Sequence, residues 1–347
     1  MDQRASPSRP PLLIVGGMHR SGTSLLASLL AGAGLHMGDD LLGAGKGNPE
    51  GHFEDKEFYR LHLRMLAGNG LSADGFTSAE SIGVPPPCHE DASELVERRR
   101  AAGRPWGWKE PRTILFLDFW ADLLPESRWL FVVRPPWEVV DSLYRRGDTA
   151  FLANPRFAAD VWVAYNRRIL KFVRSMPARA AVVHTEQVIG DPAGVIQLAA
   201  ELACTPLASP PTRFRKELFV TGLPAHCAAL VHGANPETLP IYRDLLACAY
   251  RDRQPGSETA VPCDSDAVAT AGMIEWSRAC TVRAERDDTI TRMRIDRNAL
   301  TAERTRLQAE CAALASQLDA ERSLCDSLRQ ELTARKSSFW SMWRRFA

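Results

Sequence analysis

The feature that most constrains the fold is an apolar strand that runs through a short turn into an apolar helix, 13-LIVGGMHRSGTSLLASLLAGAG-34. Leu13–Val15 form a short apolar run typical of a buried strand, and an apolar helical pattern begins near Thr23. Gly16 and Gly17 allow a close approach of the backbone to a neighbouring group. Because the free N–H groups at the start of a helix face such a turn, the segment favours a bound anion.

This turn has the frame of the phosphate-binding P-loop, G-x-x-x-x-G-K-[ST], except at one position. Gly17, Gly22 and Ser24 keep the frame, whereas Thr23 stands where the P-loop has lysine. The cation within the turn is Arg20, and hydroxyl groups follow it closely. These donors favour an anion site over an ordinary strand-to-helix turn, which is the alternative interpretation.

Strand and helix patterns alternate from residue 12 to residue 184. Strand patterns cover Leu12–Val15, Trp106–Trp108, Trp129–Val133 and Ala180–His184. Helical patterns cover Gly22–Ala33, Glu54–Ala67, Asp91–Ala102, Thr113–Leu124, Trp137–Arg146 and Ala158–Met176. The alternation predicts an α/β fold in which a P-loop-NTPase-like parallel sheet is flanked by helices.

Ligands of such a sheet bind beyond the carboxyl ends of its strands. Three segments at these ends carry charged or hydroxyl side chains: 16-GGMHRSG-22, 109-KEPR-112 and 134-RPPWEVVDS-142. Two long loops, at about 35–53 and 70–87, are rich in Gly, Pro, Asn and Ser and are candidate lids over this edge.

A second anion site is predicted after the strand that ends at Val133. The Arg134 guanidinium can hold a phosphate through two N–H groups, and the Ser142 hydroxyl adds a third donor. The alternative is a partly exposed Arg134 beside a helix in which Asp141 pairs with Arg145.

Composition excludes several classes of protein. The chain has 347 residues, of which 45% are hydrophobic, with 43 basic against 42 acidic residues, so it can bury one sizeable core and has no overall attraction to nucleic acid. The first ten residues have no apolar signal region, and no apolar run reaches the length of a membrane span. We therefore expect a cytoplasmic protein without a nucleic-acid partner.

Eight cysteines are scattered along the chain without a C-x-x-C motif or zinc spacing. We expect reduced thiols and no metal.

The chain from about Ile290 to Arg335 follows a heptad pattern. With Ile290 at position a, ten of the fourteen a and d residues are apolar, and neither Gly nor Pro interrupts the stretch. This pattern favours a coiled coil, with a dimer as the default, over a solvated single helix. Arg297 and Arg304 at adjacent a positions weaken the seam. The last segment, 337-SSFWSMWRRFA-347, suits a membrane interface or a docking peptide, the alternative being a frayed helix end.

Taken together, these segments resemble the sulfotransferase family, whose members bind 3′-phosphoadenylyl sulfate (PAPS). In that family a [KR]-[ST]-G-T-[ST] loop follows the first strand and R-x7-S follows a later one. This chain has 20-RSGTS-24, and Arg134 precedes Ser142 at the family spacing. The segments 48-NPEGHFED-55 and 106-WGWKEPRT-113 are similar to those of bacterial sulfotransferases with carbohydrate or related acceptors. The resemblance covers about residues 12–203.

The resemblance implies a cofactor site in two parts. The 5′-phosphosulfate is expected on the first loop, with Arg20 in place of the family lysine, and the 3′-phosphate on Arg134 and Ser142. The loop residues of this site are His19, Arg20, Ser21, Gly22, Thr23 and Ser24. No metal is needed.

Sulfuryl transfer requires a base for the acceptor and a cation for the leaving phosphate. The resemblance implies that Arg20 and Lys109 supply positive charge. It implies a base among Glu50, His52 and Glu54, with Glu50 favoured because 49-PEGHFED-55 resembles the family's K-E-x-H-F-F-D segment, although Pro49 replaces its lysine.

Three further clusters have predicted roles. Glu110 and Arg112 are expected to pair locally, and His184 and Glu186 are expected to organise the end of the fourth strand. A basic loop over the cofactor is the family feature expected at Arg213, Arg215 and Lys216.

The sequence thus predicts a flexible N-terminus at 1–11, a sulfotransferase domain at 12–252, a linker and helical lead-in at 253–281, a coiled coil at 282–336 and an aromatic and basic tail at 337–347. The expected reaction moves a sulfuryl group from PAPS to a hydroxyl of a glycan or small molecule. The alternatives are an ATP-using P-loop kinase and a nonenzymatic coiled-coil scaffold.

Overall fold

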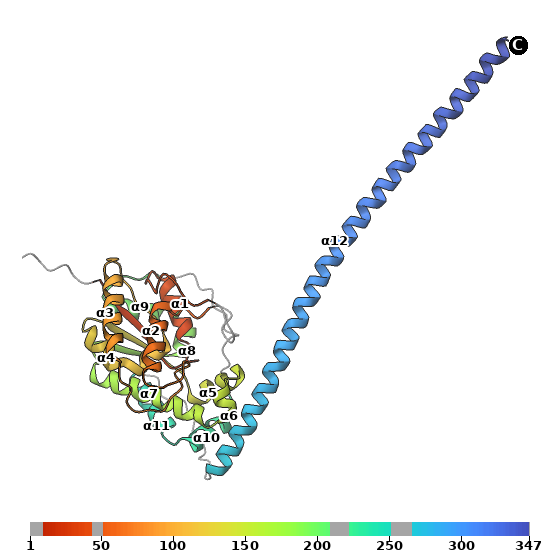
Figure 1. Ribbon diagram of the computed structural model, residues 1–347. Helices are drawn as coiled ribbons and strands as arrows, with labels where there is room; N and C mark the ends of the chain where they lie inside the picture. Colours follow the sequence, from red (N-terminus) through yellow and green to blue (C-terminus); the bar gives the residue numbers. More distant parts are fainter. Residues whose placement is uncertain (1–9, 44–50, 209–221, 251–265, 347) are drawn as a thin grey trace, which may run out of the picture. The chain divides into compact units, whose positions relative to one another are not determined.

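The computed structural model describes residues 10–43, 51–208, 222–250 and 266–346, with side chains as far as residue 338 in the last helix (Figure 1). The chain divides into two compact units, Met1–Ala284 and Glu285–Ala347. Within the linker and helical lead-in expected at 253–281, residues 253–265 lie outside the described residues.

A parallel three-stranded sheet forms the centre of the first unit. Its order is β1 (Leu13–Gly16), β2 (Arg128–Val133) and β3 (Ala180–His184). Leu13 pairs with Arg128 in the first ladder. Both faces are buried, as the continuous apolar runs of these strands require. Three predicted strands are confirmed to within one residue, and the α/β class is confirmed with them.

The prediction of a regular strand at Trp106–Trp108 is wrong, although the segment does lie along the outer edge of β1. Trp106 O accepts from Leu13 N at 3.0 Å through an isolated bridge. The next N–H, from Gly107, points away from β1 and donates to His36 O at 2.9 Å. A Cβ on Gly107 would lie 1.9 Å from Leu13 O, so this close approach requires glycine.

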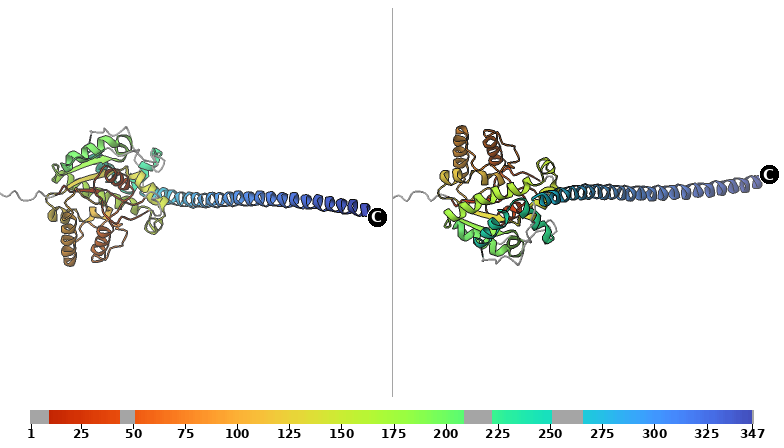
Figure 2. Two further views of the ribbon diagram at one scale, coloured as in Figure 1. Left: turned by 90° about the horizontal axis from the view of Figure 1, so that it is seen from above. Right: turned by 90° about the horizontal axis from the view of Figure 1, so that it is seen from below.

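Helices cover both faces of the sheet (Figure 2). On one face, α1 (Thr23–Gly32) and α9 (Pro192–Ala203) share an apolar core with β1 and β2. The larger core on the other face holds side chains from α2 (Lys56–Ala67), α3 (Pro86–Arg100), the 3₁₀ helix η1 (Pro111–Phe116), α4 (Leu117–Leu123), α5 (Pro136–Arg146), α6 (Thr149–Ala153), α7 (Phe157–Ser175), α10 (Ala225–Ala234) and α11 (Thr238–Ala247). The short α8 (Thr185–Gly190) follows β3 directly.

Two predicted helices differ from the structure. The helix expected from Asp91 begins at Pro86, because proline at the first helical turn supplies a suitable φ without losing a hydrogen bond. The helix expected at Thr113–Leu124 is divided into η1 and α4, and the proline at position 111 starts the 3₁₀ turn.

The last helix, α12 (Asp266–Phe346), contributes to both units (Figure 1). Its beginning belongs to the core of the first unit, where Met273, Ser277 and Cys280 are buried at helical spacing. The second unit is the continuation of this helix. A coiled coil needs a partner chain and so remains a prediction. None of the described helices is long and apolar enough to cross a membrane.

Candidate functional site

The turn between β1 and α1 has the backbone of an anion-binding loop. Gly17 has φ 154°, and a Cβ there would lie 2.7 Å from Val132 O. Arg20 and Gly22 both have left-handed φ values, of 68° and 92°. Gly22 is the N-cap of α1 and makes no side-chain cap hydrogen bond. The first N–H groups of α1 therefore open onto the turn, where a helix attracts negative charge.

The structure brings together the two segments, far apart in the sequence, that the motifs predict to bind the cofactor. Arg20 Nε donates to Ser142 Oγ at 2.9 Å, and Arg134 Nη1 donates to the carbonyl oxygen of Arg20 at 3.0 Å. Arg134 is buried, not partly exposed, and its Nε donates to Glu138 Oε2 at 2.9 Å. The first loop and the segment 134–142, which runs from the end of β2 into the second half of α5, thus form one continuous polar site.

Positive charge is concentrated around this site. Burial and, after it, the charges of Arg146, Arg134 and Arg145 lower the pKa of Arg20 to about 9, whereas Asp148 opposes them. A guanidinium normally titrates above pH 12, so the fall in pKa reflects first the removal of Arg20 from water and second its repulsion by neighbouring cations. A bound anion would relieve this repulsion.

Two buried polar atoms in the loop have no hydrogen-bond partner among the described residues. They are His19 Nε2 and Ser21 Oγ, on residues that are 8% and 1% exposed. The His19 ring lies edge-on to Phe76 and Tyr165, at centroid distances of 5.3 and 5.8 Å. Burial lowers the pKa of His19, as do neighbouring arginines and Lys109, so the imidazole is neutral at pH 7. Buried unsatisfied groups of this kind are rare and suit a polar ligand.

The segments after β1 and β3 are also tied together. Thr185 Oγ1 donates to Ser21 O at 2.7 Å and to Val133 O at 3.0 Å. Thr185 follows β3 directly, so the rule that ligands bind at carboxyl ends of strands could have identified it. Its hydroxyl fixes the loop carbonyl and thereby the direction of the neighbouring N–H groups.

The predicted catalytic residues His52 and Lys109 both contact the elements that flank the first loop, β1 and α1. Val15 forms a bridge with Lys109, whose Nζ donates to Glu54 Oε1 at 2.8 Å in a buried ion pair. The carbonyl oxygen of His52 accepts from Ser24 Oγ at 3.1 Å. Burial lowers the pKa of half-buried His52, which Glu54 opposes and Lys109 reinforces.

These contacts distinguish the residues predicted as candidates for the base that would deprotonate the acceptor. A neutral His52 can accept a proton, whereas Glu54 is engaged by Lys109. Glu54 also does not begin the helix, because the N-cap of α2 is Asp55, which accepts from Glu57 N at 2.9 Å. Glu50, the favoured base, lies outside the described residues, as do Arg213, Arg215 and Lys216.

A buried network of ion pairs and hydrogen bonds holds the segment 109-KEPR-112 in place. Glu110 pairs with Arg112, as predicted, and lies 2.7 Å from His62 Nδ1. Burial alone would raise the pKa of Glu110, but Arg112 and His62 lower it to about 2. Arg112 Nε also donates to Ala73 O at 2.8 Å, which links this segment to the loop before α3.

The end of β3 has the structural role expected of it. His184 Nδ1 accepts from Glu186 N as the N-cap of α8, and its Nε2 lies 2.9 Å from the Tyr242 hydroxyl.

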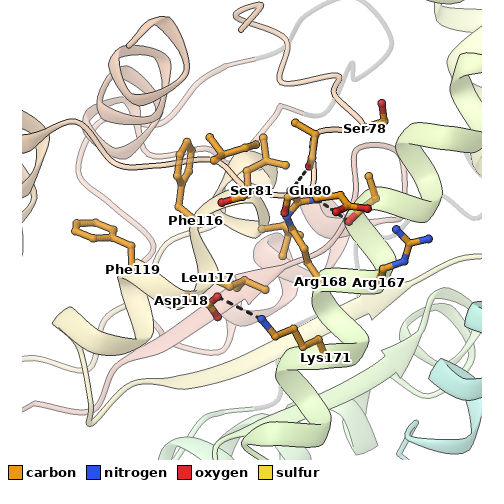
Figure 3. A pocket seen from close by; sticks show the side chains of 15 residues that line it. Ser78, Glu80, Ser81, Phe116, Leu117, Asp118, Phe119, Arg167, Arg168 and Lys171 are labelled. Carbon is orange, nitrogen blue, oxygen red and sulfur yellow. Dashed lines mark hydrogen bonds and ion pairs between the residues drawn. The ribbon is translucent and has the colours of Figure 1, made fainter. Parts of the chain in front are cut away.

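A pocket of about 410 Å³ adjoins the loop before α3 (Figure 3). Residues 78–82 of this loop, residues 114–119 and the α7 side chains Arg167, Arg168 and Lys171 line it. Figure 3 shows Asp118 and Lys171 paired across it. None of the residues predicted to bind the cofactor is among the described residues that line the pocket, so the pocket is distinct from the cluster of cations around Arg20.

A metal site is not found in the part of the chain that the structure describes. Its residues contain no group of three His, Cys, Asp or Glu side chains that could hold a metal.

Comparisons with known proteins gave structural similarities only. No protein-family model and no curated protein matches the chain. It is similar to sulfotransferase STF9 from Mycobacterium avium, with a TM-score of 0.46 and 17% identity over 67% of this chain and 77% of that one. For a sulfotransferase from Alicyclobacillus acidocaldarius the TM-score is 0.42 and the identity 16%, over 71% and 98% of the two chains.

A third similarity is to the sulfotransferase domain of the Synechococcus PCC 7002 olefin synthase, with a TM-score of 0.38 and 18% identity over 79% and 97%. All three are bacterial sulfotransferases, the family that the motifs resemble. Because these TM-scores lie below 0.5, the functional argument rests on the site residues.

Proposed function

We propose that this protein is a sulfotransferase that moves a sulfuryl group from PAPS to an acceptor hydroxyl of a carbohydrate or glycoconjugate. The observation that carries the proposal is the joined site of Arg20, Arg134 and Ser142, in which burial and, after it, neighbouring cations depress the pKa of Arg20. An arrangement in two parts suits a ligand with two anionic groups better than it suits a single phosphate.

The residues of the site fit PAPS on the chemistry of their donors. The first loop and the N-terminus of α1 would hold the 5′-phosphosulfate together with Arg20 and the Ser21 hydroxyl, which has no partner among the described residues. Arg134 and Ser142 would hold the 3′-phosphate. His19, Gly22, Thr23 and Ser24 complete the loop: Gly22 gives the backbone its turn, His19 Nε2 faces no described partner, and Thr23 and Ser24 open the helix.

The donor supplies a sulfuryl group with a good phosphate leaving group. The protein has to remove the acceptor proton and balance the charge that develops on the leaving oxygen. Arg20 and Lys109 are proposed for the charge, and the buried pairing of Lys109 with Glu54 fixes its position. Glu50 or His52 is proposed as the base, and the lowered pKa of His52 supports a neutral imidazole that can take the proton.

The acceptor, the site of action and the assembly remain proposals from the sequence. Segments 48–55 and 106–113 support a glycan or small hydroxylated acceptor, and the heptads support a homo-oligomeric coiled coil. A cytoplasmic protein with a peripheral membrane contact through 337–347 is the proposed setting, and sedimentation with anionic lipid vesicles tests the membrane contact.

Calorimetric titration with adenosine 3′,5′-bisphosphate tests the donor, with ATP and AMP in parallel. Binding is expected to need the 3′-phosphate and to weaken at least tenfold in Arg134→Ala, since a charge-assisted hydrogen bond is worth roughly 1.5–3 kcal/mol. Arg128→Ala, at the opposite end of β2, is the matched control and should bind normally. Preference for ATP would favour the kinase alternative, and binding without turnover of labelled sulfate would favour the scaffold.

A further inference from the structure

The part of α12 in the second unit carries an apolar stripe that no described residue of that unit covers. Every residue from 285 to 338 is exposed. The large apolar side chains at the heptad a and d positions are 37–70% exposed: Ile290, Met293, Leu300, Leu307, Leu314, Leu318, Leu328 and Leu332. A long helix with such a stripe gains stability only when another helix covers it.

We propose that a second copy of this chain covers the stripe, and that the two helices run parallel and in register as a two-stranded coiled coil. The inference rests on the proposed coiled coil and adds its partner, direction and alignment. Three features of the described helix support it: the charges beside the stripe, the two arginines at its a positions and the two cysteines at its a positions.

The charges beside the stripe are segregated by position. Position g carries Asp296, Glu303, Glu310 and Glu331. Position e carries Arg294, Arg322, Arg329 and Lys336. Antiparallel helices place g against g and e against e, which would bring acids to acids and bases to bases. Parallel helices place g against e of the second copy, so these charges attract or face neutral residues.

The arginines at a have a partner only in the parallel arrangement. Arg297 and Arg304 each follow an acidic g residue, Asp296 and Glu303. In a parallel dimer an a side chain lies beside the g residue that precedes the matching a residue of the other helix. Each arginine therefore reaches an acid of the second copy, and the two positions fix the register where an apolar seam alone would permit sliding.

Cys311 and Cys325 provide a readout of this alignment. Both are exposed free thiols at a positions. A parallel, in-register dimer places Cys311 opposite Cys311 of the second copy, and Cys325 likewise, whereas an antiparallel dimer places a opposite d. A disulfide forms only between cysteines whose Cα atoms come within about 7 Å.

Cross-linking of the full-length chain tests the proposal. Sedimentation under reducing conditions should give a dimer, and diamide should then link the two copies through a disulfide. Each bond joins two thiols and releases two protons and two electrons, which diamide takes up. Cys311→Ser and Cys325→Ser should each still cross-link, and the double variant, which keeps the other six cysteines, should not.

The other outcomes overturn the proposal in different ways. A dimer that does not cross-link is not parallel and in register, a larger species is not two-stranded, and a monomer under all conditions removes the coiled coil itself. Titration with adenosine 3′,5′-bisphosphate on the same samples reports the nucleotide site separately, so failure of the assembly and failure of the proposed enzyme are distinguishable.

Reversal of one charge gives a second test, because it should weaken a dimer of parallel helices but strengthen a dimer of antiparallel helices. Glu303→Lys faces Arg304 of the second copy in the parallel dimer and should raise the dimer dissociation constant about tenfold or more, because attraction becomes repulsion. In an antiparallel dimer it would face acidic g positions and tighten association. Glu310→Lys is the matched control, because it precedes Cys311 instead of an arginine, and its effect should be smaller.

Discussion

Arg20 adopts a left-handed backbone conformation with φ 68°, which costs a non-glycine residue on the order of 1–3 kcal/mol. The side chain that this conformation directs toward Ser142 is therefore held at the expense of stability. Such strain often occurs at functional residues, which supports the proposal that Arg20 takes the place of the P-loop lysine.

Replacement of Arg20 separates charge from strain. Arg20→Ala should reduce kcat/KM with PAPS by about 10²–10³, the usual effect of removing a donor to developing charge. Arg20→Gly removes the same charge and also the backbone strain. It should therefore be as inactive as Arg20→Ala, and urea unfolding should show that it is the more stable of the two variants. Activity near that of the wild type in either variant would exclude the proposed role.

His19 predicts a dependence of stability on pH. Its pKa is lowered in the folded state, so between that value and the ordinary pKa of 6.5 the unfolded chain binds a proton that the folded chain does not. Stability should therefore fall as the pH drops below 6.5, by up to about 1.4 kcal/mol per pH unit from this group.

Urea unfolding at pH 7.5 and 5.5 measures this contribution. His19→Gln should show a smaller loss between the two pH values than the wild type, because glutamine has no proton to gain. His36, His52 and His232 have lowered pKa values too, so a residual slope is expected. An identical slope in wild type and variant would contradict a neutral, buried His19.

At the scale of elements, the contact between β1 and the segment after Pro105 depends on one glycine. Gly107→Ala would place a Cβ 1.9 Å from Leu13 O and push the segment away from the sheet. A loss of roughly 2–4 kcal/mol in unfolding free energy is expected, as for other severe backbone clashes. Lys109 lies two residues further on, so turnover should fall as well.

Gly190→Ala is the control for this substitution. Gly190 ends α8, and a Cβ there meets nothing within 4 Å. Its melting temperature should stay the same or rise slightly, because alanine restricts the unfolded chain. Equal behaviour of the two variants would show that the approach to β1 is not tight.

The elements also show which parts of the fold and site are readable from sequence. Three of the four expected strands are readable because continuous apolar runs such as Trp129–Val133 have few alternatives, and Arg20, Arg134 and Ser142 are readable because they form motifs. The sequence does not assign Glu138, Arg146 or Thr185 to the site. Their roles depend on side chains that meet across elements, such as Arg134 with Glu138, and a sequence pattern does not record those distances.

At the scale of the whole molecule, the first unit extends past the boundary that the sequence predicts for the domain. The unit ends at Ala284, whereas the expected domain ends at 252. The beginning of α12 packs against α5: Trp276 Nε1 donates to Asp141 Oδ1 at 3.3 Å, and Cys280 Sγ donates to the same oxygen at 3.4 Å. Asp141 adjoins Ser142 of the proposed cofactor site and also pairs with Arg145.

Two truncated chains test whether this contact supports the site. A chain ending at Ala284 keeps the contact and should bind adenosine 3′,5′-bisphosphate as tightly as the full chain while being monomeric. A chain ending at residue 252 exposes apolar surface that Met273 and Trp276 cover, and leaves buried Asp141 without two donors. It should unfold at a lower temperature and bind the nucleotide more weakly. Trp276→Phe in the full chain, which removes one donor but keeps the ring, should lie between them. Equal stability and affinity in both truncated chains would mean that α12 attaches to a domain already complete without it.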